Sequence, residues 1–134
     1  MKLDIGSLEK AITRLAEGMV RYEQNIADEQ IRDGLIQRFE FTYELATKTL
    51  KRFLEMSSPS PDIFDSMDFQ TLIRTANEHG LLRGDWPAWR QYRDMRSQTS
   101  HTYNEAKALQ VVAGIPAFLA EAGFLRDKLR QRLA

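Results

Sequence analysis

The sequence predicts an all-α protein, an up-and-down antiparallel bundle of about five helices. Apolar residues recur at alternating spacings of three and four along most of the chain, as on the buried stripe of a helix. No run of alternating β-branched residues competes with this pattern, and proline and glycine divide it into segments. The length of 134 residues suits one compact domain, so we expect residues 1–134 to form a single bundle.

Two long helices are expected first. Ser7 is a candidate N-cap for a helix with the apolar stripe Leu8, Ile12, Leu15, Met19 and Tyr22. The second helix runs from about Asp28 to about Met56 and repeats the spacing at Leu35, Phe39, Tyr43, Ala46, Leu50 and Phe53. Uninterrupted, it would be about 40 Å long, which implies a bundle with elongated helices.

The middle of the chain predicts one short helix between two breaks. The segment from Ser57 to Pro61 ends the second helix, because proline lacks a backbone N–H and restricts the residue before it. After a short acidic connector over 62–68, a third helix is expected on the apolar positions Leu72, Ile73 and Ala76. Gly80 is placed to end this helix with a left-handed cap.

Two further helices complete the predicted bundle. Asp85 followed two residues later by Pro87 fits a cap and a first-turn proline, which open a fourth helix that runs towards His101. Asn104 fits the start of a final helix that reaches Leu133.

Gly114 and Pro116 are expected to interrupt the final helix. Pro116 cannot donate a hydrogen bond to the carbonyl of Val112, so we expect a kink there.

The composition excludes several classes of function. Nineteen basic residues balance nineteen acidic ones, which argues against nonspecific binding of a phosphate backbone, although a localised basic site is still allowed. The absence of cysteine removes disulfides, thiolate zinc sites and cysteine nucleophiles. The apolar stretches are short and the first residues are charged, so we expect a cytoplasmic protein without a membrane segment.

Most catalytic motifs are missing from the sequence. It contains no glycine-rich phosphate loop, HExxH, EF-hand loop or GxSxG. The two histidines, His79 and His101, are too few and too poorly spaced for a zinc site, and the Glu-x-x-His spacing of di-iron bundles is absent. We therefore expect neither a metal nor another cofactor.

The segment from Arg90 to Tyr103, RQYRDMRSQTSHTY, concentrates three arginines, two tyrosines, one histidine and several hydroxyls. On a continuous helix Arg96 and His101 would lie about 140° apart, and so could not share one narrow face within a monomer. Either the helix ends before His101, or the two residues meet their counterparts across a two-fold dimer axis.

An arginine and a histidine together suit metal-independent RNA cleavage, in which the substrate's own 2′-hydroxyl attacks the adjacent phosphate. Histidine can act as general acid or base near neutral pH, and arginine can hold a phosphate through paired hydrogen bonds. The alternative is structural: Arg96 pairs with Asp94 or another surface carboxylate, and His101 caps a helix end. Spacing alone favours this structural alternative.

The sequence resembles the nucleotidyltransferase substrate-binding proteins over nearly the whole chain, from about Leu8 to about Leu129. The run from Leu35 to Leu54, LIQRFEFTYELATKTLKRFL, is similar to the signature helix of that family. RSQTSHTYN, which begins at Arg96, is similar to its second signature and matches the R-x4-H-x-Y pattern of HEPN toxins. LIRTANEHGLL lies where the family has its short helix and turn.

The resemblance implies a homodimeric helical bundle whose partner is a small nucleotidyltransferase. Related toxin–antitoxin systems contain ribonucleases, which implies that Arg96 and His101 are catalytic, across the dimer interface. It also implies that the nucleotidyltransferase antitoxin transfers AMP groups to Tyr103. Ser97 and Arg93 are candidate supporting residues; the family often has Asn at the position of Ser97.

The family often has Asp after the motif tyrosine, where this chain has Asn104. The alternative function is a non-catalytic binding or scaffold subunit of a minimal nucleotidyltransferase complex.

Two pairs of residues allow two interpretations each. Glu40 and Glu44 could form a polar patch that faces the active groove, or could make ordinary i,i+4 surface pairs such as Glu44 with Lys48, and the second interpretation is favoured. Trp86 and Trp89 could anchor a partner or close the end of the bundle.

Aromatic and basic side chains elsewhere are expected to be structural. Phe39, Phe41 and Tyr43 are expected to pack in the core and the dimer rather than to stack on bases. The basic C-terminus is expected to complement the negative end of the last helix, and comprises Arg126, Lys128, Arg130 and Arg132.

Overall fold

The computed structural model describes residues 3–134 and confirms the all-α bundle. Its α-helices are α1 (Gly6–Gln24), α2 (Glu29–Ser57), α3 (Phe69–Glu78), α4 (Trp86–Gln98) and α5 (Glu105–Leu133). Two short 3-10 helices, η1 (Pro61–Phe64) and η2 (Thr99–His101), lie in the connections before α3 and after α4.

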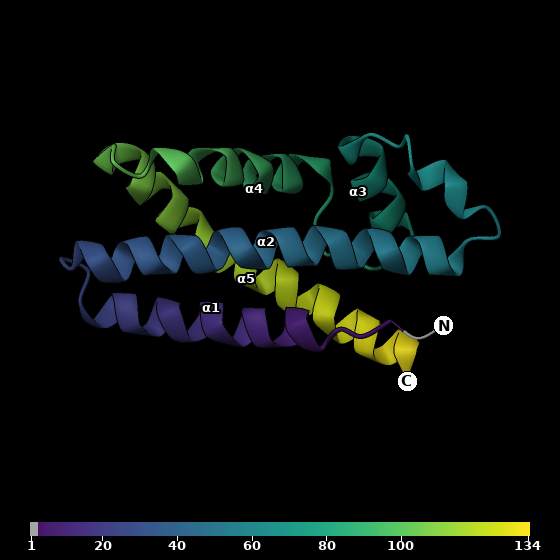
Figure 1. Cartoon of the computed structure of the whole chain (residues 1–134), viewed down its shortest axis with the longest axis horizontal. Helices are drawn as coiled ribbons and strands as arrows, with labels where there is room; N and C mark the ends of the chain where they lie inside the picture. The colour runs from purple at the N-terminus through teal and green to yellow at the C-terminus, as the bar shows by residue number, and fades with distance from the viewer. Residues whose placement is uncertain (1–2) are drawn as a thin grey trace.

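Helix α2 forms the centre of the bundle. It packs against α1, α4 and α5, and Figure 1 shows α1 and α4 on opposite sides of it. Helices α1, α2, α4 and α5 alternate in direction along the long axis, whereas α3 is short and crosses that axis steeply at one end (Figure 1). The described residues that precede α1 and the C-terminus lie close together at that same end (Figure 1).

The predicted helix boundaries are confirmed where a short polar side chain or a glycine sets them. Asp28 caps α2 by accepting hydrogen bonds from the N–H groups of Gln30 and Ile31, and Asp85 and Asn104 are the N-caps of α4 and α5. Gly80 follows α3 with a φ of 76°, the left-handed conformation that ends a helix.

The predicted cap of α1 is wrong. Helix α1 begins at Gly6, so Ser7 lies inside its first turn and Ile5 occupies the N-cap position without a side-chain hydrogen bond. The carboxylate of Asp4 instead accepts a hydrogen bond from Gly6 N–H at 2.8 Å, which satisfies one of the free donors at this end.

The expected interruption of the last helix is also wrong, whereas the kink expected at Pro116 stays a prediction. Helix α5 continues through Gly114 and Pro116 as one helix of 29 residues. A single proline removes only one backbone hydrogen bond, and the side chains on either side of it, Ile115 and Phe118, are fully buried in the bundle. Tertiary packing therefore holds the helix together where local propensity would break it.

Helix α5 bears on the expectation that the chain has no membrane segment, which stays a prediction. By length and composition alone it is apolar enough to cross a membrane, with a mean hydropathy of 1.6 over its most apolar stretch. The buried core helix of a bundle meets the same criteria, and 44% of that stretch is buried inside this bundle.

A cluster of aromatic side chains joins α2, α4 and α5. Phe118 of α5 packs edge-to-face on Phe39, Trp89 and Tyr92, at centroid distances of 5.0 to 6.2 Å. Such edge-to-face pairs stabilise a core beyond the area they bury. The cluster fixes α4, and with it the segment that follows, against the centre of the bundle.

Glu121 fixes the loop that leads into α4. Its carboxylate is 2% exposed and accepts hydrogen bonds from the backbone N–H groups of Arg83 and Gly84, at 2.8 and 2.7 Å, and from Trp89 Nε1 at 3.1 Å. These three donors stabilise a charge that would otherwise be costly to bury. The loop over 82–85 is thereby held to α5.

Candidate functional site

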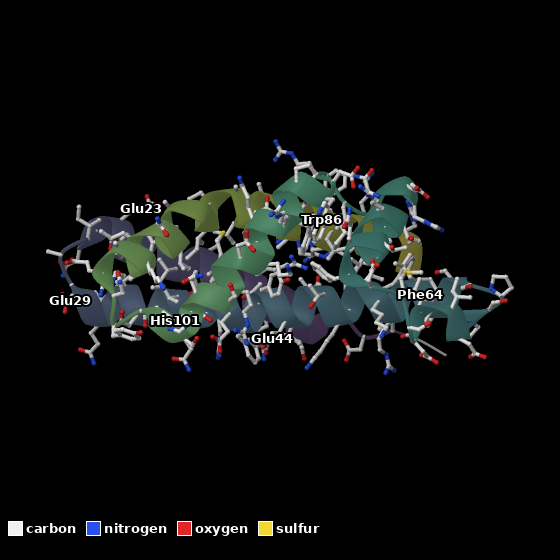
Figure 2. The ribbon with its side chains drawn as sticks, turned by 90° about the horizontal axis from the view of Figure 1, so that it is seen from above. Glu23, Glu29, Glu44, Phe64, Trp86 and His101 are labelled. Atoms are coloured by element: carbon white, nitrogen blue, oxygen red, sulfur yellow. The ribbon has the colours of Figure 1, made fainter. Side chains whose placement is uncertain are left out.

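The R-x4-H-x-Y segment lies at the end of α4 that is far from α3. Helix α4 ends at Gln98, η2 carries His101, and α5 begins at Glu105. The helix therefore ends before His101, which is the first of the two arrangements that the sequence allowed. In the projection of Figure 2, His101 and Glu44 lie along the same edge of the bundle.

Arg96 faces α2, where two carboxylates bind it. Its Nη2 donates a hydrogen bond to Glu44 Oε1 at 2.6 Å, and its Nη1 lies 3.6 Å from Glu40 Oε2. Thr99 joins the cluster, since its hydroxyl accepts from Arg96 Nη1 at 3.2 Å and donates to Glu40 Oε2 at 2.5 Å. The structural alternative for Arg96 is thus realised, but with α2 and not with Asp94.

The same contacts overturn the favoured interpretation of the two glutamates. Glu40 and Glu44 form a polar patch towards the motif segment, and Glu44 binds Arg96 of α4 rather than an i,i+4 partner on its own helix. The hydrogen bond from Arg96 lowers the pKa of Glu44, and the same bond raises the pKa of Arg96. Both groups are therefore charged at neutral pH, and the cluster places two carboxylates around one guanidinium.

His101 and Tyr103 form the second part of the site. Their rings lie 6.0 Å apart between centroids in an edge-to-face arrangement, with the imidazole partly exposed. Tyr103 is 86% exposed, whereas Tyr22, Tyr43 and Tyr92 are at most 8% exposed. Tyr103 is thus the one tyrosine of the four in the chain that another protein can reach.

The structure does not join the two predicted catalytic side chains within one protomer. Arg96 binds side chains of α2 and η2, whereas His101 contacts Tyr103, and none of the contacts found over residues 3–134 links Arg96 to His101. Ending the helix before His101 is therefore not sufficient to unite them.

The candidate supporting residues lie outside the Arg96 cluster. The hydroxyl of Ser97 is exposed and donates to the carbonyl of Asp94 at 2.7 Å. Arg93 lies over the ring of Trp86, with its guanidinium carbon 5.0 Å from the centroid. Thr99 is the residue that the sequence interpretation missed; its position three residues after Arg96, one helical turn away, was the available signal.

The other aromatic side chains singled out in the sequence differ in how deeply they are buried. Phe39 and Tyr43 are buried as expected. Phe41 is 60% exposed and so lies outside the core of the protomer, and its packing in a dimer stays a prediction. Trp89 is fully buried and Trp86 packs edge-to-face on Phe69, so both serve the interior of this end of the bundle.

At the C-terminus, basic side chains find partners within the chain. Arg130 forms an ion pair with Glu9, and Arg132 donates a hydrogen bond to the carbonyl of His79. Within the described residues, no group of three or more His, Asp or Glu side chains is arranged to hold a metal ion.

These features define a small all-helical bundle protein in which the end of the fourth helix carries an arginine bound to α2, and the turn after it carries a histidine beside an exposed tyrosine. The chain belongs to the family described as nucleotidyltransferase substrate binding protein like, whose sequence profile matches residues 3–131. The family name itself points to a nucleotidyltransferase as partner.

Individual relatives agree with this membership. A Haemophilus influenzae protein named "Probable ribonuclease HepT" is 39% identical over 127 residues, which cover 94% of this chain and 86% of that protein. A solved structure from Haemophilus influenzae, described as the fold of a substrate binding domain of a nucleotidyltransferase, has a TM-score of 0.88. It is 36% identical, and the match covers 95% of this chain and 99% of that one. A crystal structure from Thermus thermophilus has a TM-score of 0.70 at 31% identity, over 92% and 98% of the two chains.

Proposed function

We propose that this protein is a metal-independent endoribonuclease, the toxin of a toxin–antitoxin pair in the cytoplasm. The observation that carries the proposal is His101 on the surface turn after α4, with its imidazole partly exposed and beside an exposed tyrosine. A histidine in such a position can exchange protons with a bound RNA. The relative named "Probable ribonuclease HepT" supports the same activity.

The proposed reaction needs only proton transfer and charge stabilisation. The substrate's 2′-oxygen bonds to the adjacent phosphorus while the bond from that phosphorus to the 5′-oxygen breaks. The products are a cyclic phosphate and a free 5′-hydroxyl. His101 accepts the proton of the 2′-hydroxyl, and the His101 imidazolium formed in this way donates that proton to the departing 5′-oxygen.

Arg96 stabilises the negative charge that develops on the phosphate. It acts across the interface of a homodimer, on a phosphate bound at His101 of the other protomer. Within one protomer Arg96 is bound to Glu44 and Glu40 and does not contact His101. Across a two-fold axis, Arg96 of one protomer and His101 of the other can face one phosphate. The phosphate then competes with the two carboxylates for the guanidinium.

The nucleotidyltransferase partner silences the toxin by transferring AMP from ATP to Tyr103. The Tyr103 oxygen attacks the α-phosphorus of ATP, a new P–O bond forms, the bond to the β-phosphate oxygen breaks, and pyrophosphate leaves. The phenolic proton passes to a base of the partner or to water. Exposure supports this assignment, because the other three tyrosines are buried. An added phosphate beside His101 would repel the RNA.

An RNA-cleavage assay tests the catalytic assignment. Wild type and the matched control His79→Ala should cleave RNA equally, because His79 lies after α3 and bonds to the carbonyl of Thr75. His101→Ala should lose at least about a hundredfold in rate, as expected for removal of a general acid–base. Equal rates for His101→Ala and His79→Ala would refute the role of His101.

The modification is tested by mass spectrometry after incubation with the partner nucleotidyltransferase and ATP. Wild type and the buried-tyrosine control Tyr22→Phe should gain AMP, and Tyr103→Phe should not. A gain of equal mass by Tyr103→Phe would place the acceptor elsewhere.

One observation favours a second candidate function, a non-catalytic binding subunit of the nucleotidyltransferase. The two carboxylates around Arg96 offset the positive charge that a phosphate would need. Under this alternative, wild type cleaves no RNA yet co-purifies with the nucleotidyltransferase, and His101→Ala binds that partner as well as wild type does.

A further inference from the structure

A pocket of about 390 Å³ opens between α2, η1, α3 and α4, on the side of α2 that carries Glu44. This volume is within the range of about 300–1,000 Å³ that is usual for small-molecule sites. Three basic side chains line it: Lys48 and Lys51 from α2, and Arg93 from α4. None of the lining residues is a carboxylate.

The three cations form no ion pair within the described part of the chain. The ion pairs found there involve other arginines and none includes Lys48, Lys51 or Arg93. Glu44 lies one turn from Lys48, but its carboxylate is bound to Arg96. The charge of Lys48 contributes to the lowered pKa of Glu44, so that carboxylate offsets part of it, and the three cations together leave the pocket with a basic lining.

The floor of the pocket is apolar and aromatic. Phe64 is buried, and the half-buried Phe69 packs against Tyr43 and edge-to-face against Trp86, at centroid distances of 6.5 and 5.9 Å. The contact between Arg93 and the Trp86 ring holds this guanidinium near the rim. Figure 2 shows Phe64 farther along the bundle from His101 than Glu44 is.

We propose that this pocket binds one nucleotide unit of single-stranded RNA, with a phosphate on the three basic side chains and the base against the aromatic floor. Cations that follow the backbone, together with aromatic rings for the bases, are the general means by which proteins hold single strands. The proposal rests on the proposed ribonuclease function, for which it names a substrate subsite.

Helix geometry places this subsite next to the motif segment. Arg93 precedes Arg96 by three residues on α4 and Lys48 follows Glu44 by four on α2, so each lies about one turn, or about 5 Å along the axis, from the Arg96–Glu44 pair. An RNA strand with one phosphate at Arg96 can therefore continue into the pocket. A second basic groove contains Lys10, Arg14 and Arg38. It is lined by residues of α1 and α2 and by none of α4, which carries Arg96.

RNA binding to a variant that cannot cleave tests the site. In the His101→Ala background, fluorescence anisotropy with a labelled short single-stranded RNA should show that Lys48→Gln and Lys51→Gln each weaken binding by about fivefold. Each should also lower the slope of log K against log salt by about 0.7, the value for one lost phosphate contact on a single strand. The matched control Arg14→Gln removes the same charge from the other groove and should leave both quantities unchanged.

Two results would overturn the subsite: weaker binding by Arg14→Gln alone, or unchanged binding by both lysine variants. Titration of wild type with AMP, followed by NMR, separates this failure from failure of the ribonuclease function. If RNA is not cleaved, but AMP shifts the signals of Phe64 and Phe69 in wild type and not in Lys51→Gln, the site is real and the reaction is not. If RNA is cleaved with an unchanged KM in Lys51→Gln, the reaction is real and the site is not.

Discussion

Arg96 and Glu44 lie 52 residues apart in the sequence, and their side chains meet at 2.6 Å between α4 and α2. The contact anchors the end of α4, where the motif segment begins, to the central helix of the bundle. In this contact Glu44 binds the Arg96 guanidinium, which is the group that we propose binds the RNA phosphate. The pair thus links the stability of this end of the bundle to its chemistry, and each effect is measurable.

Glu44→Gln is expected to lower the free energy of unfolding by about 0.5 kcal/mol at pH 7, as for other partly exposed ion pairs. The pKa of Glu44 in the folded protein lies below its ordinary value of 4.5. The contribution of the pair is therefore fully present above about pH 5 and is lost as the pH falls through the lowered pKa.

Urea unfolding between pH 7 and pH 3 measures this difference between wild type and Glu44→Gln. The control Glu17→Gln, on an exposed position of α1, should show a smaller difference that changes less with pH. A difference for Glu44→Gln that grows on acidification would contradict the assigned pair.

The same substitution is expected to strengthen RNA binding in the His101→Ala background. Removal of one negative charge next to the proposed phosphate site should lower the Kd about threefold, which corresponds to roughly 0.7 kcal/mol of relieved repulsion. Fluorescence anisotropy with single-stranded RNA measures the change, with Glu17→Gln again as the control. Weaker binding by Glu44→Gln would mean that the carboxylate positions Arg96 for the phosphate instead of competing with it.

Glu121→Ala is expected to destabilise the fold strongly, by about 3 kcal/mol or more. The substitution leaves three donors without their acceptor, the N–H groups of Arg83, Gly84 and the Trp89 indole. Urea unfolding followed by tryptophan fluorescence measures the loss. Glu78→Ala, at an exposed position near the end of α3, is the control and should cost less than about 0.5 kcal/mol.

Replacement of two glycines by alanine is expected to change the stability of the protein in opposite directions. Gly80→Ala should cost about 1 kcal/mol, because its φ of 76° is strained for a residue with a Cβ. Gly34→Ala, within α2, should stabilise the protein by about 0.5–1 kcal/mol, since a Cβ there meets nothing within 4 Å and alanine favours helix. Thermal unfolding compares the two, and equal effects would contradict the left-handed conformation at Gly80.

The sequence by itself determined the helices and most of their ends. The spacing of apolar residues places the helical stripes, and the caps at Asp28, Asp85 and Asn104, with Gly80 after α3, act within a few residues of their own position. Such local physics is readable from the chain alone. The sequence also located the segment with Arg96, His101 and Tyr103, because these residues lie within one short stretch of the chain.

Only the tertiary structure decided what depends on how the helices face one another. Local rules favoured an interruption at Pro116 and a pairing of Glu44 with its own helix, and both expectations failed because packing between helices outweighed them. Tertiary structure likewise left Tyr103 exposed while it buried the other tyrosines, and it gathered Lys48, Lys51 and Arg93 around one pocket. These relationships join residues from different helices, so they depend on the relative rotation of those helices, which local periodicity does not specify.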